Sequence, residues 1–141
     1  MEVKTFDQLS TRELYEILKT RAAIFIVEQN CAYQDLDDID FKSTHIMLYS
    51  DGELVAYSRV FKDDESGLWH IGRVLTTQRN KHFGLRIMEE AIRVAKEMDA
   101  QLIEIEAQSY AIGFYEQLGF EVSSNEFLLD GILHRRMLLH L

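Results

Sequence analysis

The residues most able to do chemistry lie at a predicted strand-to-helix junction. Arg79, Lys81 and His82 follow a strand-like run that ends near Thr76, and an amphipathic stretch begins at Gly84. The first amides of a helix have no intrahelical acceptors, and the helix dipole places partial positive charge at this end. The pattern therefore predicts an anion site suited to a phosphorylated ligand. The alternative interpretation is a solvated surface on which basic residues cluster by chance.

The hydrophobic pattern predicts the elements that position this junction. Strands are expected over seven ranges: 1–6, 45–49, 54–61, 69–76, 102–107, 121–129 and 132–139. Helices are expected over residues 11–28, 84–98 and 110–118, and a loop over residues 33–42. This order predicts an α/β (α+β) fold in which helices flank a mixed, mostly antiparallel sheet. Only the strand-helix-strand unit of residues 69–107 requires a parallel pair of strands.

The composition limits the possible functions of the chain. Its 141 residues, 47% of them hydrophobic, predict one domain over residues 1–141 without a linker. Fifteen basic and twenty-four acidic residues give a net charge of −9, which argues against nucleic acid and membrane surfaces as partners. A single cysteine, Cys31, and the lack of a signal-peptide pattern predict a cytoplasmic protein. The sequence leaves a homodimer open.

Two motifs resemble those of a known enzyme superfamily. Arg79-x-x-His82-x-Gly84 is similar to the pattern Gln/Arg-x-x-Gly-x-Gly/Ala, with a histidine in place of the middle glycine. Residues 115–120, Tyr-Glu-Gln-Leu-Gly-Phe, match a second pattern, Tyr-x-x-x-Gly-Phe. With both motifs in this order, the chain resembles the GNAT superfamily of acyl-CoA-dependent N-acyltransferases. Further similarity, for example over residues 21–35, is to its ElaA-like branch and spans nearly the whole chain.

The resemblance implies that acetyl-CoA is the cosubstrate and lies in a cleft where two central strands splay apart. The pantetheine arm is then expected to pair with the backbone of Val74, Leu75 and Thr76. The pyrophosphate is expected to bind backbone amides of the following turn: Lys81, His82, Phe83, Gly84 and Leu85. Positive charge is expected from Arg79 and Lys81. From the residues alone, strand 69–76 is equally an ordinary member of a sheet ladder.

Four residues are candidates for proton transfer. By helical periodicity Tyr115 is a core aromatic, whereas the resemblance implies that it protonates the departing thiolate. A general base must deprotonate the acceptor amine, and the candidates are His70, Glu28 and His45. A lone histidine on a strand is more often structural. Strand alternation predicts that His70 shares one face with three other residues: Gly72, Val74 and Thr76.

Charged residues within the predicted strands need partners. Arg59 and Arg73 are expected to form ion pairs with Glu104 and Glu106 on a neighbouring strand. Four aspartates between residues 35 and 40 resemble a calcium loop, but its glycine and its final glutamate are missing, so no metal is expected. These aspartates are instead predicted to form an acidic rim that attracts cationic amines.

Together these features predict the transfer of an acetyl group from acetyl-CoA to a primary amine of a small molecule or peptide. The amine is expected to attack the thioester directly in a ternary complex. The alternative is a non-catalytic module that binds acyl-CoA as a sensor or recruits a partner.

Overall fold

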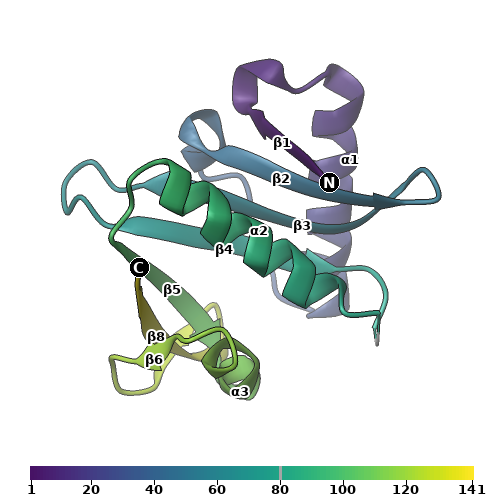
Figure 1. The fold of residues 1–141 in the computed structure, drawn as a ribbon. Helices are drawn as coiled ribbons and strands as arrows, with labels where there is room; N and C mark the ends of the chain where they lie inside the picture. Colours follow the sequence, from purple (N-terminus) through teal and green to yellow (C-terminus); the bar gives the residue numbers. More distant parts are fainter. Residues whose placement is uncertain (80) are drawn as a thin grey trace.

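The computed structural model describes residues 1–79 and 81–141 and contains an eight-stranded mixed sheet (Figure 1). Its strands are β1 (Glu2–Thr5), β2 (Thr44–Ser50), β3 (Glu53–Lys62), β4 (Trp69–Thr76), β5 (Leu102–Gln108), β6 (Glu121–Val122), β7 (Phe127–Leu129) and β8 (Ile132–His140). Their spatial order is β1-β2-β3-β4-β5-β8-β6, with β7 also paired to β8. The pairs are antiparallel except β4 with β5. The predicted mixed, mostly antiparallel α/β fold is therefore confirmed.

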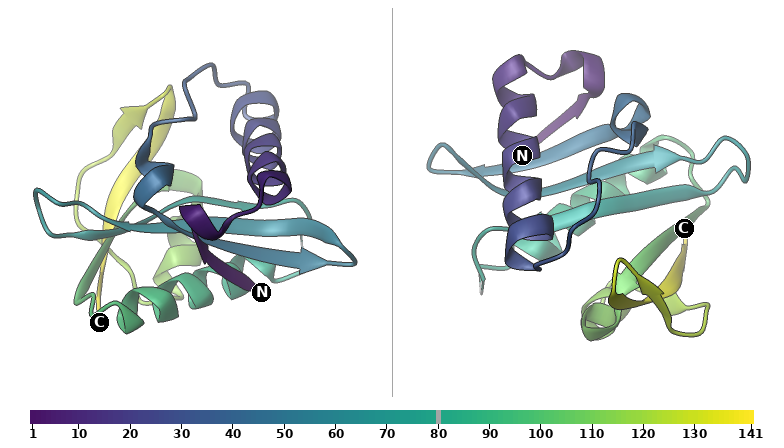
Figure 2. Two further views of the ribbon diagram at one scale, coloured as in Figure 1. Left: turned by 90° about the horizontal axis from the view of Figure 1, so that it is seen from above. Right: turned by 180° about the vertical axis from the view of Figure 1, so that it is seen from behind.

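Helices cover both faces of the sheet. α2 (Phe83–Glu97) crosses one face, and α1 (Thr11–Arg21) with the π-helix η2 (Ala22–Glu28) lies on the other (Figure 2). The inward stripe of α2 is buried in the main core: Ile87, Met88, Ala91, Val94 and Ala95. A smaller core lies on the α1 face of the sheet: Ile17, Met47, Leu54, Tyr57 and Leu75. Within the described ranges, no helix combines the length and the apolar character needed to cross a membrane.

The first helix begins as its sequence predicts but changes pitch. The side chain of Ser10 accepts a hydrogen bond from the amide of Glu13, and the Glu13 carboxylate accepts one from the amide of Ser10, which is the expected capping box. The predicted helix over residues 11–28 is α-helical only to Arg21 and continues as the π-helix η2. A π-helix is uncommon and often occurs at functional sites. Here it directs Ile24, Phe25 and Glu28 toward the space beside β4.

The turns between strands follow the predicted chemistry. Asp51 and Gly52 join β2 to β3 with φ angles of 53° and 80°, and Asp130 and Gly131 join β7 to β8 with 51° and 78°. Two successive positive φ angles define the turn that suits a tight hairpin. The strand predicted over residues 121–129 is instead divided into β6 and β7, because Ser123 and Ser124 hydrogen-bond to the backbone of β8 between them.

Several short elements differ from the predictions. The predicted helix over residues 110–118 consists of a 3-10 turn, η4 (Ser109–Ala111), followed by the short helix α3 (Ile112–Glu116). The predicted loop over residues 33–42 ends in the 3-10 turn η3 (Ile39–Lys42). Another 3-10 turn, η1 (Phe6–Gln8), follows β1. The helix predicted from Gly84 begins one residue earlier, at Phe83.

The centre of the sheet is open. β4 and β5 pair only at Trp69 with Ile103 and at His70 with Glu104, and beyond these positions the two strands diverge. This opening confirms the predicted splayed central strands. It exposes one edge of β4 from Ile71 to its end, so that backbone groups there face a gap rather than a neighbouring strand.

A bulge in β4 changes which side chains face which way. Gly72 lies opposite Arg59 and Leu75 lies opposite Tyr57, so β4 carries one extra residue between these pairs. Arg73 adopts a φ angle of 51° at this position. His70 and Gly72 therefore lie on the α1 face, whereas Val74 and Thr76 lie on the α2 face. The prediction that all four share one face is wrong, because simple alternation does not hold across a bulge.

Candidate active site

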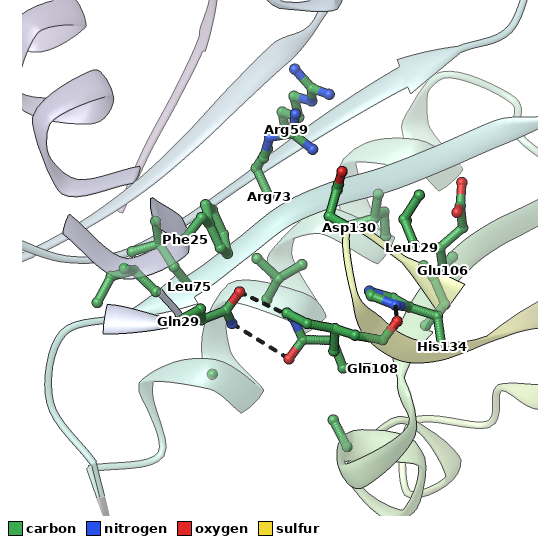
Figure 3. A pocket seen from close by; sticks show the side chains of 18 of the residues that line it. Phe25, Gln29, Arg59, Arg73, Leu75, Glu106, Gln108, Leu129, Asp130 and His134 are labelled. Atoms are coloured by element: carbon green, nitrogen blue, oxygen red, sulfur yellow. Dashed lines mark hydrogen bonds between the residues drawn. The ribbon is translucent and has the colours of Figure 1, made fainter. Parts of the chain in front are cut away.

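A cavity of about 770 Å³ occupies the region where β4 and β5 diverge (Figure 3). Its walls come from η2, from β4 and β5, from the start of α3, and from the β7–β8 hairpin. Elements from distant parts of the sequence therefore meet around one space. A volume of this size is in the range of small-molecule binding sites.

One wall of the cavity is the open part of β4. Val74, Leu75 and Thr76 all line it, as do Arg79 and Gly84 beyond the end of the strand. Of the predicted cofactor-binding residues, the other four lie outside the lining of this cavity: Lys81, His82, Phe83 and Leu85. They belong to the turn and to the first turn of α2, next to the end of the lined wall. Asn80, which belongs to the predicted basic turn, lies outside the described residues.

The start of α2 has backbone amides without acceptors in the helix itself. His82 is the N-cap residue, with a left-handed φ of 57° and no side-chain cap, and its carbonyl accepts the first helical bond from the amide of Arg86 at 3.2 Å. The amides of Phe83, Gly84 and Leu85 therefore have no acceptor within the helix. This is the geometry of an anion site at a helix N-terminus. The histidine that replaces the middle glycine of the motif is accommodated in a conformation that glycine adopts more easily.

Gly84 brings this helix start close to its neighbours. A Cβ at this position would lie 3.5 Å from Phe114 and 3.6 Å from the methyl group of Thr76. Arg79 is nearly fully exposed and lies 3.6 Å from the carboxylate of Glu28, so the pair joins the basic turn to η2. An exposed pair of this kind contributes little to stability. Arg79 is therefore available for an anionic ligand.

Tyr115 lines the cavity from α3. Its ring packs edge-on against Phe114 and Phe120, with centroid distances of 5.1 and 6.0 Å. Burial raises the pKa of the Tyr115 phenol to about 12, so the hydroxyl is protonated at neutral pH. A protonated phenol at the edge of the cavity is compatible with proton donation, and its packing is compatible with a core role. The assignment of Tyr115 as an acid stays a prediction.

The three predicted bases lie in different environments. His70 lines the cavity near the point where β4 and β5 still pair, and its ring stacks on Phe61 at 5.1 Å. Glu28 is exposed at the end of η2 and also lines the cavity. His45 is fully buried and does not line it. For His70 and Glu28 the role of base stays a prediction.

Hydrogen bonds to the protein hold both nitrogens of the His45 ring. Its Nε2–H donates to the carbonyl of Asp40 at 2.9 Å, and its Nδ1 accepts a hydrogen bond from the Tyr57 hydroxyl at 2.6 Å. Burial lowers the pKa of the ring, which keeps it neutral. Both ring nitrogens are thus occupied by protein partners away from the cavity, which argues against His45 as the base.

Three arginines and three aspartates form an ion-pair network beside the cavity. Arg21 binds Asp35 at 2.9 Å and Asp40 at 2.6 Å. Arg59 binds Asp40 at 3.0 Å and Asp37 at 2.6 Å. A third arginine, on the β4 bulge, closes the network through two of the same aspartates: Arg73 binds Asp35 at 2.7 Å and Asp37 at 3.3 Å.

The network corrects two predictions. Arg59 and Arg73 do not pair with Glu104 and Glu106, because the loop of residues 33–42 folds over the α1 face and brings its aspartates closer. The acidic rim is also wrong, because three of its four aspartates are bound to arginines. Burial by itself opposes the ionisation of Asp40, yet hydrogen bonds and charge from Arg21 and Arg59 lower the pKa of this carboxyl. The six charges balance, so the network is neutral.

Sequence reasoning missed a polar stripe on β5. Glu104, Glu106 and Gln108 alternate with the buried residues of this strand and line the cavity. Figure 3 shows the Gln108 amide paired with that of Gln29, and the two nitrogen-to-oxygen distances are 3.4 and 3.5 Å. This pair joins η2 to β5 across the cavity. The period of two in the polar residues was the available signal.

The β7–β8 hairpin supplies a further wall that the sequence did not indicate. His134 and Asp130 both line the cavity, and the Cys31 thiol donates a hydrogen bond to the Asp130 carbonyl at 3.0 Å. The hairpin is thereby attached to the segment that follows η2. No local pattern predicts this contact, which joins residues 99 positions apart.

Comparison with known proteins agrees with this fold. Residues 6–141 match the family model described as an acetyltransferase (GNAT) domain, so the chain belongs to the GNAT acetyltransferase family. It is 36% identical to a UPF0039 protein of Schizosaccharomyces pombe, over 98% of this chain and 95% of the relative. It is similar to the crystal structure of Escherichia coli ElaA, with a TM-score of 0.92, 31% identity, and coverage of 99% of this chain and 97% of that one. An acyl-CoA N-acyltransferase from Pseudomonas aeruginosa gives a TM-score of 0.91 at 31% identity, covering 98% and 97%.

Proposed function

We propose that this protein transfers an acetyl group from acetyl-CoA to a primary amine of a small molecule or peptide, by direct attack in a ternary complex. The observation that carries the proposal is the open seam between β4 and β5, which pair at two positions only and then enclose a cavity. An ordinary sheet would continue the ladder there. An open parallel seam instead leaves an edge to which an extended, amide-rich ligand can add as a strand.

The cofactor side of the cavity suits coenzyme A. The backbone of Val74, Leu75 and Thr76 is available to the two amides of a pantetheine arm. The amides at the start of α2, which have no acceptor within the helix, are suited to the pyrophosphate, and Arg79 can add positive charge. The strand residues, Arg79 and Gly84 all line the cavity, and Gly84 belongs to the first turn of α2. Their order matches that of the chemical groups in the ligand.

The β4 bulge offers a donor for the reacting carbonyl. Arg73 and Val74 are not paired with residues of β3 because of the bulge. On the other side of β4, pairing with β5 has already ended at His70. The amide of Val74 is therefore suited to donate to the thioester oxygen and to stabilise negative charge that develops on it. Tyr115 lines the same cavity, which supports a role for its hydroxyl in protonating the departing thiolate.

The acceptor side is acidic. Among the described residues, no cationic group lies within ion-pair distance of Glu104 or Glu106, and both line the cavity. The neighbouring arginine network carries no net charge, so it does not offset these carboxylates. Unpaired carboxylates in a cavity favour a cationic partner, which an alkylammonium acceptor provides.

A direct assay tests the proposal. The protein is mixed with acetyl-CoA and a panel of diamines, polyamines, amino acids and peptide N-termini, and thiol release is followed. We expect release that depends on the amine, together with thermal stabilisation of the protein by acetyl-CoA alone. Stabilisation without turnover on any amine would favour the binding module instead. A matched control is the double substitution Arg93→Gln and Lys96→Gln on the exposed side of α2, away from the cavity, which should leave turnover unchanged.

A further inference from the structure

His134 is a buried histidine in the cavity wall whose ring is held in one orientation. It lies on β8 and is 7% exposed, and its ring stacks on Phe127 with centroids 6.1 Å apart and planes 23° apart. Its Nδ1 lies 2.7 Å from the carbonyl oxygen of Ile132. A carbonyl oxygen can only accept, so Nδ1 carries the hydrogen. In the neutral ring the lone pair is therefore at Nε2.

The Nε2 atom of His134 lacks a protein partner. Among the described residues no hydrogen bond involves it, while the ring lines the cavity beside Gln108 (Figure 3). Gln108 lies directly opposite in the β5–β8 ladder, but its side-chain amide is already paired with Gln29. Although the His134 residue is buried as a whole, its Nε2 atom keeps access to solvent. An acceptor nitrogen with a free lone pair in the wall of a ligand cavity can accept a hydrogen from a bound ligand.

We propose that His134 is the general base of the acyl transfer, an assignment that rests on the proposed function. Nε2 takes one proton from the acceptor ammonium, and the neutral amine nitrogen then forms a bond to the thioester carbonyl carbon. The carbon–sulfur bond breaks, and the thiolate receives a proton from Tyr115. The new amide loses its second proton, which restores the phenol, and the proton on His134 is released to solvent.

The orientation of His134 favours it over the other candidates. A base works best when a second hydrogen bond fixes its tautomer, and the Ile132 carbonyl does this for His134. His70 is stacked on Phe61, and within the described residues no hydrogen bond fixes its tautomer. Glu28 is exposed and is paired with Arg79.

The charges around His134 also bear on its role. Glu106 on β5 and Asp130 at the hairpin turn are acidic residues that line the same cavity. Arg136, two residues along β8 and on the same face as His134, is basic. Its guanidinium is held over the Phe127 ring at 5.0 Å. Ser109 binds Glu126, the acidic residue next to Phe127.

The test uses the whole protein, with acetyl-CoA and 1,4-diaminobutane as the acceptor. His134→Asn keeps a side-chain donor near the Ile132 carbonyl but removes the Nε2 lone pair. We expect kcat to fall on the order of 10² to 10⁴-fold, and the acidic limb of the pH profile of kcat/KM to disappear. The affinity for acetyl-CoA, measured by thermal-shift titration, should stay within about twofold, since the variant leaves the β4 wall intact.

Two controls separate catalysis from folding. His134→Ala leaves space beside Phe127, and added imidazole should restore part of its turnover, which a purely structural role does not predict. His70→Asn should keep the acidic limb. The proposal is overturned if His134→Asn retains wild-type turnover with an unchanged pH profile, or if the limb disappears in His70→Asn instead. Wild-type protein without turnover on any amine would overturn the proposed function and this assignment together, whereas turnover that His134 does not affect overturns only the latter.

Discussion

Replacing Asp40 by asparagine tests how strongly the buried ion-pair network stabilises the fold. One carboxylate oxygen of Asp40 accepts hydrogen bonds from Arg21 at 2.6 Å and from Arg59 at 3.0 Å. Arg21 is completely buried, and Arg59 is 2% exposed. Asparagine keeps the size and one oxygen of the side chain but removes the negative charge. Two buried guanidinium groups then lose their shared counter-charge.

The expected loss in the free energy of unfolding follows from the burial of the two arginines. Removing one partner of a buried ion pair typically costs 3 to 5 kcal/mol, because the remaining charge stays in a medium of low polarity. Asp35 and Asp37 still bind the two arginines, so we expect the lower end, about 3 kcal/mol. For a chain of this length that loss corresponds to a decrease in Tm of about 10 °C.

The structure also predicts how the stability difference between wild type and Asp40→Asn changes with pH. The arginines lower the pKa of Asp40 below its usual range. A carboxyl with a lowered folded pKa contributes stability that is complete above its unfolded pKa of about 3.9 and is lost as pH falls through the folded pKa. The difference in the free energy of unfolding between wild type and Asp40→Asn should therefore be constant near neutral pH and shrink in acid.

Urea denaturation at several pH values measures this difference. The matched control is Arg93→Gln, which removes an exposed arginine paired with Glu90 and Glu97 on α2. Its cost should be below about 1 kcal/mol. If Asp40→Asn costs no more than Arg93→Gln, or if its cost does not shrink in acid, the network contributes no more than a surface pair and our reasoning fails.

Three further predictions concern the site. Tyr115→Phe should lower turnover by about 10²-fold and leave the acetyl-CoA affinity unchanged, because it removes only a proton donor. Turnover equal to that of the wild type would show that Tyr115 serves packing alone. Changing Glu104 and Glu106 together to glutamine should raise KM for 1,4-diaminobutane about tenfold, with KM for acetyl-CoA unchanged; an unaltered diamine KM would exclude both residues from acceptor binding. Gly84→Ala should raise the free energy of unfolding by about 0.5 kcal/mol, because alanine favours a helix more than glycine does. The added Cβ would meet its neighbours at ordinary distances of 3.5 and 3.6 Å. A lower free energy of unfolding in urea denaturation would contradict this prediction.

Local signals predicted most of the elements correctly. The Ser10 capping box, the Asp51-Gly52 turn and the Asp130-Gly131 turn depend on residues within four positions of one another, and each forms as expected. The amphipathic pattern of α2 likewise predicted a helix within one residue of its true start. Such features follow from backbone preferences and from hydrophobic periodicity, which act over short distances along the chain.

The β4 bulge is a feature that local sequence patterns did not predict. Alternation predicted one face for His70 and Val74, but Arg73 inserts an extra residue and places them on opposite faces. The ion pairs of Arg73 with Asp35 and Asp37 lie on the bulged strand and join residues 36 and 38 positions apart. A pattern within one strand carries no information about which loop will fold over it.

The sequence by itself determined the order of strands and helices, the basic turn before α2, and the family motifs that point to acyl transfer. Only the tertiary structure decided which charges are paired and which face the cavity. Glu104 lies in a predicted strand and Asp40 in a predicted loop. Glu104 lines the cavity without an ion-pair partner in the described chain, whereas Asp40 is buried between two arginines. The surroundings of the His134 ring were decided in the same way, because the ring stacks on Phe127 of β7 and lies beside Gln108 of β5. These outcomes depend on distances between segments, and packing of the whole chain sets those distances.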